Sequence, residues 1–312
     1  MSHIKKALCI LSLLICYACP KDEATNSITI SGAWALYPLV IRWQEEYAKY
    51  NPGITIEITA GGAGKGMNDV LAGLVDMAMV SRNLRKEEKE RGALELAVAR
   101  DAVLPTINQD NPVLKILTWR GVNKDELRKI WIEHKITNWK QLLIGQTNYD
   151  INLYTRADAC GAGQVWAEFL GGTQEELAGI QINGDPALAE AVAKDRLGLG
   201  YNNIGFVFDA QTKKPVAGLA ILKIDFNQNG KIDPDEDFYH SQSDVVDAIR
   251  DGRFPSPPAR TLYFVTNGKP TKKVQLDFLI WILTTGQSFV EETGYIKLNE
   301  VILNEALAKI KH

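Results

Sequence analysis

Three turns built from small residues, each set between a strand pattern and a helix pattern, constrain this chain more than any other feature. The clearest is the turn at 155–163, which follows the mostly apolar run 151–154 and precedes the helical pattern 164–170. Similar turns occur at 31–37 and 61–66. Short turns that lead from a strand into a helix are typical of β-α-β units, in which the strands are mostly parallel. The pattern therefore predicts an α/β fold.

The length and the punctuation of the chain predict two lobes. A chain of 312 residues can form one large domain or two ordinary ones. Strand and helix patterns continue to the C-terminus, and the proline-rich segment 255–258 is the clearest break. We expect 28–111 and 259–312 to form lobe I, and 112–258 to form lobe II. The chain would then cross twice between the lobes.

The N-terminus has the features of a targeting segment. Residues 1–18 place two lysines before an apolar run of about 12 residues, which is too short to span a bilayer but suits a signal peptide. Cys19 follows a small residue and precedes polar ones, as in a bacterial lipoprotein lipobox, so we expect lipidation at Cys19. The alternative is an ordinary secreted protein with one spare cysteine. Residues 19–27 would be a polar tether. The expected location is extracytoplasmic, lipid-anchored to a bacterial membrane, in the periplasm or at the cell surface.

The charge balance argues against a nucleic-acid partner. The chain has 35 Lys and Arg against 38 Asp and Glu, a formal net charge of -3. Proteins that bind nucleic acid usually carry a basic excess on one surface. The four histidines are scattered and show no metal-ligand spacing. After loss of the signal peptide and lipidation of Cys19, Cys160 would be the remaining free thiol, so no disulfide framework is expected.

The three turns are also candidates for binding an anion. A helix N-terminus presents unpaired N–H groups and a partial positive charge. Glycine lets backbone amides approach a ligand closely. Arg156, in the third turn, adds a guanidinium group whose donors match an oxyanion. If the turns meet in the fold, they predict a site for a small oxyanion.

Several segments, in this order along the chain, resemble the phosphate-binding protein of bacterial phosphate ABC transporters. The segments are 31–38, the glycine turn before Val75-Asp76, Ser81-Arg82, 136–139, the turn at Arg156, and 199–201. The resemblance covers roughly 28–300. It implies a two-lobed type II periplasmic-binding-protein fold, with the ligand in the cleft between lobes joined by two crossing segments. It also implies capture of phosphate for an ABC permease in the membrane, without catalysis.

Carried onto this sequence, the resemblance and the turn chemistry select one set of ligand-binding candidates. These are Ala35, Leu36, Tyr37, Gly61, Gly62, Ala63, Ser81, Arg82, Arg156, Asp158, Cys160, Gly161 and Ala162. The family usually has hydroxyl residues where this chain has Leu36, Cys160 and Ala162. Each missing hydroxyl removes a donor worth about 1 kcal/mol or more against a charged acceptor. The family also has an acidic residue at the position of Ser81, where it accepts a proton from hydrogen phosphate. Sulfate or another tetrahedral oxyanion is therefore an alternative to phosphate.

Structural roles compete with ligand binding at the two arginines. Arg156 could form a salt bridge with Asp158 that only stabilises its lobe. Arg82 could pair with Glu87 or Glu88 instead of adding charge to the site. An ion pair of this kind would leave the backbone amides as the main donors.

An enzyme is the less favoured class. Cys160 could be taken for a nucleophile, but no histidine lies near it in the sequence, and a cysteine at a helix start is more often a small packed residue. A phosphohydrolase would need a histidine-rich or carboxylate-rich metal cluster, which the sequence lacks.

A second motif, at 225–236, matches the 12-residue calcium loop at every diagnostic position. The candidate ligands are Asp225, Asn227, Asn229, Lys231 through its carbonyl, Asp233 and Glu236. Ca²⁺ prefers such a set of oxygens, and Gly230 supplies the sharp turn. Strand and loop patterns flank the motif instead of paired helices, so we expect one structural Ca²⁺ and no sensor. The alternatives are an acidic surface turn and, for the whole protein, a calcium-stabilised surface lipoprotein used for sensing or adhesion.

Overall fold

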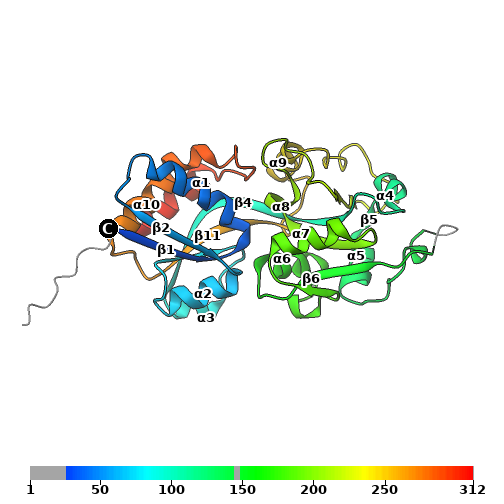
Figure 1. The fold of residues 1–312 in the computed structure, drawn as a ribbon, viewed down its shortest axis with the longest axis horizontal. Helices are drawn as coiled ribbons and strands as arrows, with labels where there is room; N and C mark the ends of the chain where they lie inside the picture. Colours follow the sequence, from blue (N-terminus) through cyan, green and yellow to red (C-terminus); the bar gives the residue numbers. More distant parts are fainter. Residues whose placement is uncertain (1–25, 144–147, 312) are drawn as a thin grey trace, which may run out of the picture.

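The computed structural model describes residues 26–143 and 148–311. Two lobes lie next to each other along the longest axis of the molecule (Figure 1). Lobe I contains the N-terminal elements, drawn in blue, together with the C-terminal elements, drawn in orange and red. Lobe II is drawn mainly in green and yellow. The predicted signal peptide at 1–18 and the lipidation candidate Cys19 lie outside the described residues.

Lobe I is built from strand–helix units and a returning C-terminal segment. Its elements are β1 (Ser27–Gly32), η1 (Trp34–Leu36), α1 (Tyr37–Ala48), β2 (Thr55–Ala60), α2 (Ala63–Leu71), β3 (Met77–Val80), α3 (Lys86–Glu90), β11 (Ala259–Asn267), α10 (Lys273–Leu283), η4 (Thr285–Phe289) and α11 (Glu300–Ile310). Ile28 and Ile30 alternate with polar residues along β1 and are buried. The C-terminal Phe278 packs in the same core, and Trp43 Nε1 donates to the carbonyl of Gly286 (2.7 Å).

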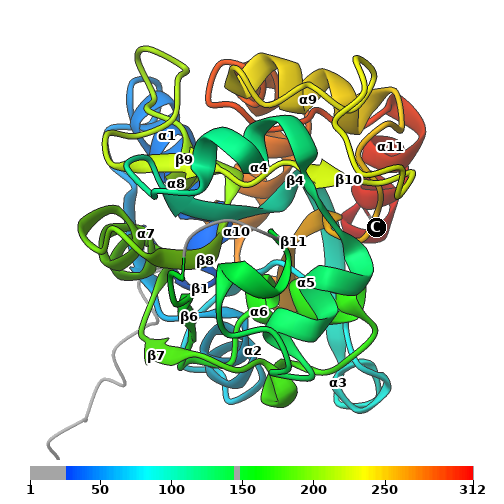
Figure 2. The ribbon, with the colours of Figure 1, turned by 90° about the vertical axis from the view of Figure 1, so that its right-hand side faces the viewer.

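Lobe II repeats the strand–helix pattern with different connections. Its elements are α4 (Leu114–Arg120), β5 (Val122–Asn123), α5 (Lys124–Trp131), η2 (Trp139–Gln141), β6 (Asn152–Arg156), α6 (Gly161–Leu170), η3 (Gln174–Glu176), β7 (Ile180–Ile182), α7 (Asp185–Lys194), β8 (Gly198–Asn203), α8 (Ile204–Val207), β9 (Leu219–Ile221), β10 (Ile224–Asp225) and α9 (Gln242–Arg250). Figure 2 looks onto this lobe, with α4 and α9 on one side and α5 and α6 on the other. Trp131, Trp166 and Tyr201 pack ring against ring in its core.

One long strand, β4 (Ala93–Asn108), belongs to both lobes. Its first part pairs with β11 of lobe I as far as Ala102, and from Val103 onward it pairs with β8 of lobe II. The first crossing therefore lies inside β4, earlier than the boundary predicted between 111 and 112. The strand order is β2-β1-β3-β11-β4-β8-β6-β7, with β9 also on β4. Pairing is parallel around β1 and β6. It is antiparallel around β4 and β11, because these strands carry the chain out to lobe II and back.

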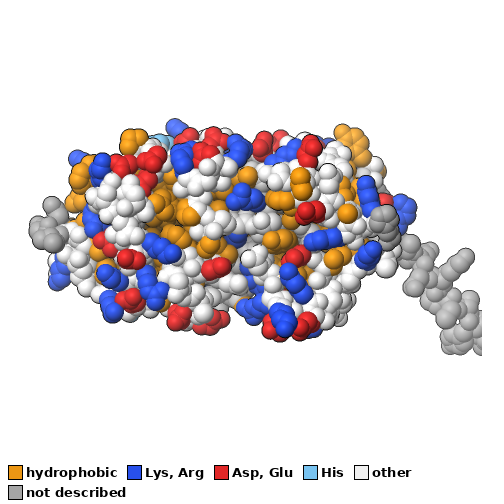
Figure 3. All heavy atoms as spheres, turned by 180° about the vertical axis from the view of Figure 1, so that it is seen from behind, with side chains coloured by type: hydrophobic (Ala, Val, Ile, Leu, Met, Phe, Trp, Pro, Cys, Tyr) orange, Lys and Arg blue, Asp and Glu red, His pale blue; other side chains and the backbone are white. Residues whose placement is uncertain are grey.

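The surface of the molecule carries charges of both signs. Lys and Arg side chains are interspersed with Asp and Glu over the face drawn in Figure 3, as expected from the small net charge. None of the helices in the described ranges is long and apolar enough to cross a bilayer.

Candidate functional site

The three predicted turns meet at a small hollow where the two lobes face each other. The hollow is narrow: about 140 Å³ of empty space lies between its walls, and in this closed form none of that space is wide enough for a water molecule. Lobe I contributes its wall from η1, from the start of α2 and from the residue after β3. Lobe II contributes the end of β6, the start of α6, the start of α7 and the end of β8. The lining residues are Ala33, Trp34, Ala35, Gly62, Ala63, Ser81, Arg156, Cys160, Gly161, Ala162, Asp185 and Asn203.

Unpaired backbone amides from both lobes line this hollow. Trp34 and Ala35 begin η1, Ala63 begins α2, and Gly161 and Ala162 begin α6. None of these five N–H groups donates a hydrogen bond to another described residue. The first N–H groups of a helix have no partner within the helix, and a buried amide without a partner costs free energy. An oxyanion in the hollow would accept from these donors and would also gain from the helix dipoles.

The glycine turn at 61–66 shapes the hollow more than it donates to it. The amides of Gly61 and Gly62 both donate to the carbonyl of Gly32 (2.9 and 3.0 Å). Gly62 has a φ of 90°, which L-residues with a side chain rarely adopt. An added Cβ there would lie 2.7 Å from Asp158 Oδ2 of lobe II. Gly61 does not line the hollow, and the donor of this turn is the amide of Ala63.

Leu36 and Tyr37 were predicted to face the ligand, but they do not line the hollow. The amide of Leu36 donates to the carbonyl of Ala33 (3.2 Å), and that of Tyr37 donates to the carbonyl of Trp34. The side chain of Leu36 is fully buried in the core of lobe I. A short helical turn, which the sequence pattern did not indicate, uses these two amides. The donors that remain are one and two residues earlier.

Arg156 is buried and held by carboxylates. Its Nε donates to Asp158 Oδ1 (2.8 Å), its Nη2 to Asp158 Oδ2, and its Nη1 to Asp185 Oδ2. Burial by itself lowers the pKa of Arg156, but Asp185 and Asp158 outweigh it and raise the pKa, so the guanidinium stays charged. A guanidinium has five N–H groups, and these bonds use three of them. Asp158 orients Arg156 without itself lining the hollow.

Sequence reasoning missed three residues that complete the site. Asp185 and Asn203 line the hollow, and the amide of Asn203 donates to Asp185 Oδ1 (3.2 Å). Tyr295, which is fully buried, donates from its hydroxyl to the carbonyl of Ala35 (2.8 Å) and so fixes η1 from the C-terminal segment. An acidic residue before a proline at a helix start was a usable local signal for Asp185. No local signal marks the other two, because their partners are distant in sequence.

Ser81 and Gly161 bring the lobes into contact beside the hollow. A Cβ added to Gly161 would lie 2.3 Å from both the carbonyl oxygen and Oγ of Ser81. Gly64 of lobe I also donates from its amide to the carbonyl of Ala159 in lobe II (3.1 Å). Ser81 is 2% exposed. The structure therefore has its lobes closed on each other, and at these two contacts the residues have little or no side chain.

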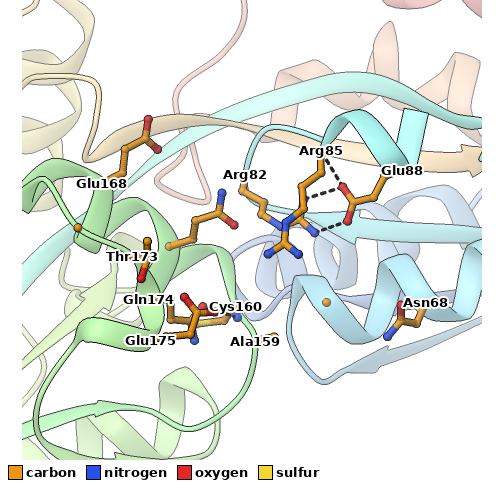
Figure 4. A pocket seen from close by; sticks show the side chains of 13 residues that line it. Asn68, Arg82, Arg85, Glu88, Ala159, Cys160, Glu168, Thr173, Gln174 and Glu175 are labelled. Carbon is orange, nitrogen blue, oxygen red and sulfur yellow. Dashed lines mark hydrogen bonds and ion pairs between the residues drawn. The ribbon is translucent and has the colours of Figure 1, made fainter. Parts of the chain in front are cut away.

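Arg82 lies outside the hollow. Its guanidinium donates to both oxygens of Glu88 (2.8 and 2.6 Å) and to the carbonyl of Asn83 (3.0 Å). This ion pair is one of the structural alternatives considered for Arg82. Figure 4 shows Arg82 and Glu88 in a neighbouring pocket of about 470 Å³, with Arg85 beside them and with Glu168 across from them on lobe II.

Cys160 serves as the N-cap of α6. Its Sγ accepts a hydrogen bond from the amide of Gly163 (3.2 Å), and burial raises the pKa of its thiol to about 11. A neutral thiol is a poor nucleophile. The geometry of Cys160 is that of a packed capping residue.

The calcium-type loop follows β10 and folds around its own carboxylates. The side chain of Asp225 accepts from the amides of Asn229 (3.2 Å) and Gly230 (2.8 Å). Glu236 Oε1 accepts from the amide of Asn227 (3.0 Å). Both Asp225 and Glu236 are buried, which places two carboxylates inside the loop. The strand β10 pairs with β5, so the loop is attached to lobe II next to α4.

Asp233 is held by hydrogen bonds from other residues of the loop. Lys231, followed by the side-chain amides of Asn227 and Asn229, lowers the pKa of Asp233 to about 2. In the described part of the chain, no group of three or more His, Cys, Asp or Glu side chains is gathered as a metal site. An ion in this loop would therefore depend on the Asn side-chain oxygens and the carbonyl of Lys231 as well as on carboxylates.

The sequence profile of the PBP superfamily domain matches residues 20–285. The chain belongs to this superfamily. Among curated relatives of this PBP-superfamily chain, Protein SphX of Synechococcus elongatus is 28% identical over 295 residues, which cover 89% of the chain and 80% of the relative. The phosphate-binding protein PstS of Borreliella burgdorferi is 26% identical over 295 residues, covering 92% of the chain and 95% of the relative.

Solved structures confirm the predicted two-lobed α/β fold. A protein from Clostridium perfringens, solved with bound phosphate and described as a phosphate ABC transporter substrate-binding protein, superposes with a TM-score of 0.69. The sequences are 23% identical, and the superposition covers 88% of this PBP-superfamily chain and 100% of the other. At this sequence identity the likeness establishes the fold alone and does not identify the ligand.

Proposed function

We propose that this protein binds phosphate outside the cytoplasm and delivers it to an ABC permease. The observation that carries the proposal is the set of five unpaired amides, from two lobes, around one small hollow that Arg156 also lines. The names of the relatives PstS and SphX, and the bound phosphate in the Clostridium perfringens structure, support the same ligand class. Cys160 is a protonated capping residue, which supports binding without turnover.

Sulfate is the second candidate, and a specific observation favours it. Ser81 lies at the hollow where the family has a proton-accepting acid, and its hydroxyl donates to no other described residue. A hydroxyl can donate to a fully ionised oxygen, whereas a carboxylate would repel it. The site therefore accepts an oxyanion without requiring a proton on it. We place phosphate first because of the relatives.

Titration calorimetry with phosphate, sulfate, arsenate and molybdate at two pH values tests this assignment. We expect one tight site per chain for phosphate. Heat with sulfate but none with phosphate would reverse the order of the two candidates, and no heat with any tetrahedral oxyanion would remove the proposed function.

A proline substitution isolates the contribution of one amide. Ala63 is the first residue of α2, where proline is well tolerated, and Ala63→Pro removes an N–H and puts a ring carbon in its place. A hydrogen bond to a charged acceptor contributes about 1.5–3 kcal/mol, so affinity should fall about 10- to 100-fold with little loss of stability. Glu300→Pro, at the equivalent position of the exposed helix α11, is the matched control and should bind normally.

We also propose that residues 1–18 are a signal peptide and that Cys19 carries a lipid anchor. The support is the sequence pattern, together with a polar tether that would separate the anchor from β1; because β1 begins at Ser27, the tether ends one residue earlier than the predicted 19–27. Growth with a labelled fatty acid should label the wild-type protein, and Cys19→Ala should abolish the label and release the protein from membranes. An unlabelled wild-type protein would favour the secreted alternative.

A structural calcium ion in the loop at 225–236 is a further part of the proposal. The supporting observations are the spacing of the oxygen ligands and the two buried carboxylates, Asp225 and Glu236, that the loop folds around. A ligand that binds the folded state raises the melting temperature. The melting temperature of the wild-type protein should therefore be higher with added calcium than with chelator. The substitution Glu236→Gln should remove most of this difference. Equal melting temperatures with and without calcium would refute the site.

A further inference from the structure

A buried ion pair joins the two strands at the point where the chain crosses between the lobes. Asp101 in β4 and Arg260 in β11 are direct cross-strand partners. Arg260 Nε donates to Asp101 Oδ1 (2.8 Å) and its Nη2 to Asp101 Oδ2 (3.2 Å). Asp101 is 0% and Arg260 6% exposed. The next pair, Ala102 with Ala259, is the last before β4 leaves β11 and joins lobe II.

Hydrogen bonds continue from this ion pair to the arginine of the hollow. Arg260 Nη2 also donates to Asn203 Oδ1. The backbone N–H of Asn203 donates to Asp185 Oδ1 (3.2 Å), and Asp185 Oδ2 accepts from Arg156 Nη1. Asn203, Asp185 and Arg156 all line the hollow, whereas Arg260 stands behind them. The crossing strands and the site are thus joined by an unbroken chain of polar contacts.

Two donors in this chain of contacts have no partner within the described protein. Arg260 Nη1 is buried and makes no hydrogen bond. The side-chain nitrogen of Asn203 also donates to no described residue, while its oxygen is held by Arg260. The lack of a partner is notable for Arg260 Nη1, because leaving a buried donor unpaired costs about 1–3 kcal/mol. Since Arg260 holds the Asn203 oxygen, the Asn203 nitrogen is left for the hollow.

A purely structural role explains these contacts poorly. A buried ion pair contributes little net stability, because apolar residues of similar volume are often as stable in its place. A guanidinium, unlike a lysine ammonium, can hold Asp101 and Asn203 at once with its planar set of donors. We propose that Arg260, anchored by Asp101, is a positioning residue for oxyanion binding: it fixes Asn203 and, through Asp185, Arg156 relative to the crossing strands. This inference rests on the proposed function.

Arg260→Lys separates positioning from stability. Lysine keeps a positive charge beside Asp101 but cannot bridge Asp101 and Asn203 in the same way. We expect its melting temperature to stay within a few degrees of the wild type, while its affinity for phosphate, measured by calorimetry well below melting, falls at least about tenfold. Arg260→Met should lower both. If Arg260→Met does not fold, Arg260→Lys still decides the question.

A matched variant controls for the loss of any arginine–carboxylate pair. Arg120 donates to both oxygens of Glu126 (2.9 and 2.6 Å) in lobe II, and neither residue lines the hollow. Arg120→Met should lower the melting temperature and leave phosphate affinity unchanged. Wild-type affinity in Arg260→Lys, or an equal loss in Arg120→Met, would overturn the inference. A wild-type protein that binds neither phosphate nor sulfate would instead defeat the proposed function, before any variant is compared.

Discussion

One added methyl group at the contact between Gly161 and Ser81 should weaken oxyanion binding without lowering the stability of the ligand-free protein. In Gly161→Ala, the new Cβ would lie 2.3 Å from the carbonyl oxygen and Oγ of Ser81, whereas ordinary contacts begin at 3.4 Å. The added methyl group would therefore keep the lobes about 1 Å further apart at this point. The carbonyl of Ser81 is backbone and cannot rotate away as a long side chain could.

The expected cost falls on ligand binding. Overpacking of this kind costs about 1–3 kcal/mol, which corresponds to roughly 10- to 100-fold weaker binding if closure is required. If the lobes separate in the ligand-free protein, the added methyl group meets no obstacle there, and alanine is preferred to glycine at a helical position. The free energy of unfolding of the ligand-free protein should therefore be unchanged or slightly higher.

Two other glycine variants serve as controls in the same calorimetry and urea-unfolding experiments. A Cβ on Gly66 would lie 2.6 Å from Gly32 Cα, inside lobe I, so Gly66→Ala should lower stability whatever the lobes do. Gly53 has nothing within 4 Å, so Gly53→Ala should change neither quantity. Wild-type affinity in Gly161→Ala would show that the closed contact is not part of the bound state, and the reasoning would fail.

Three further changes should have distinct effects. Ser81→Asp introduces an acidic proton acceptor and should raise the ratio of phosphate affinity to sulfate affinity about tenfold, as measured by calorimetry. An unchanged ratio would mean that the residue at position 81 does not contact the protonated oxygen of the ligand. Arg156→Met leaves Asp158 and Asp185 without their cation and should lower the free energy of unfolding by about 3–5 kcal/mol. Because the pKa of Cys160 is raised to about 11, its alkylation should be slow at pH 8 and rise with pH until about 11; rapid labelling of the folded protein at pH 8 would contradict this.

The fold was predictable where local chemistry decides the structure. Small residues at the starts of α2 and α6 indicated strand-to-helix turns. The position of the crossing was not predictable in the same way. Residues 93–108 form one strand whose partner changes from β11 to β8, and that change depends on register with segments more than 90 residues away.

The candidate site, like the fold, was predictable where local sequence decides the structure and not where tertiary packing does. Amide donors at helix starts can be predicted, because a helix N-terminus always leaves them unpaired. The partners of Arg156 and Arg82 could be narrowed to a few carboxylates, but the choice depended on tertiary packing. Asn203 and Tyr295 were missed because the residues that they contact, Arg260 and Ala35, are 57 and 260 residues away in the sequence. Local sequence determines which groups are offered, and packing determines which of them meet.

The most direct test of the account is a crystal structure of the protein grown in phosphate. We expect a tetrahedral anion between the lobes, with oxygens within hydrogen-bond distance of the backbone amides of Ala35, Ala63 and Ala162 and of the guanidinium of Arg156. Phosphate bound in solution but found elsewhere in the crystal, with these amides still unpaired, would contradict it.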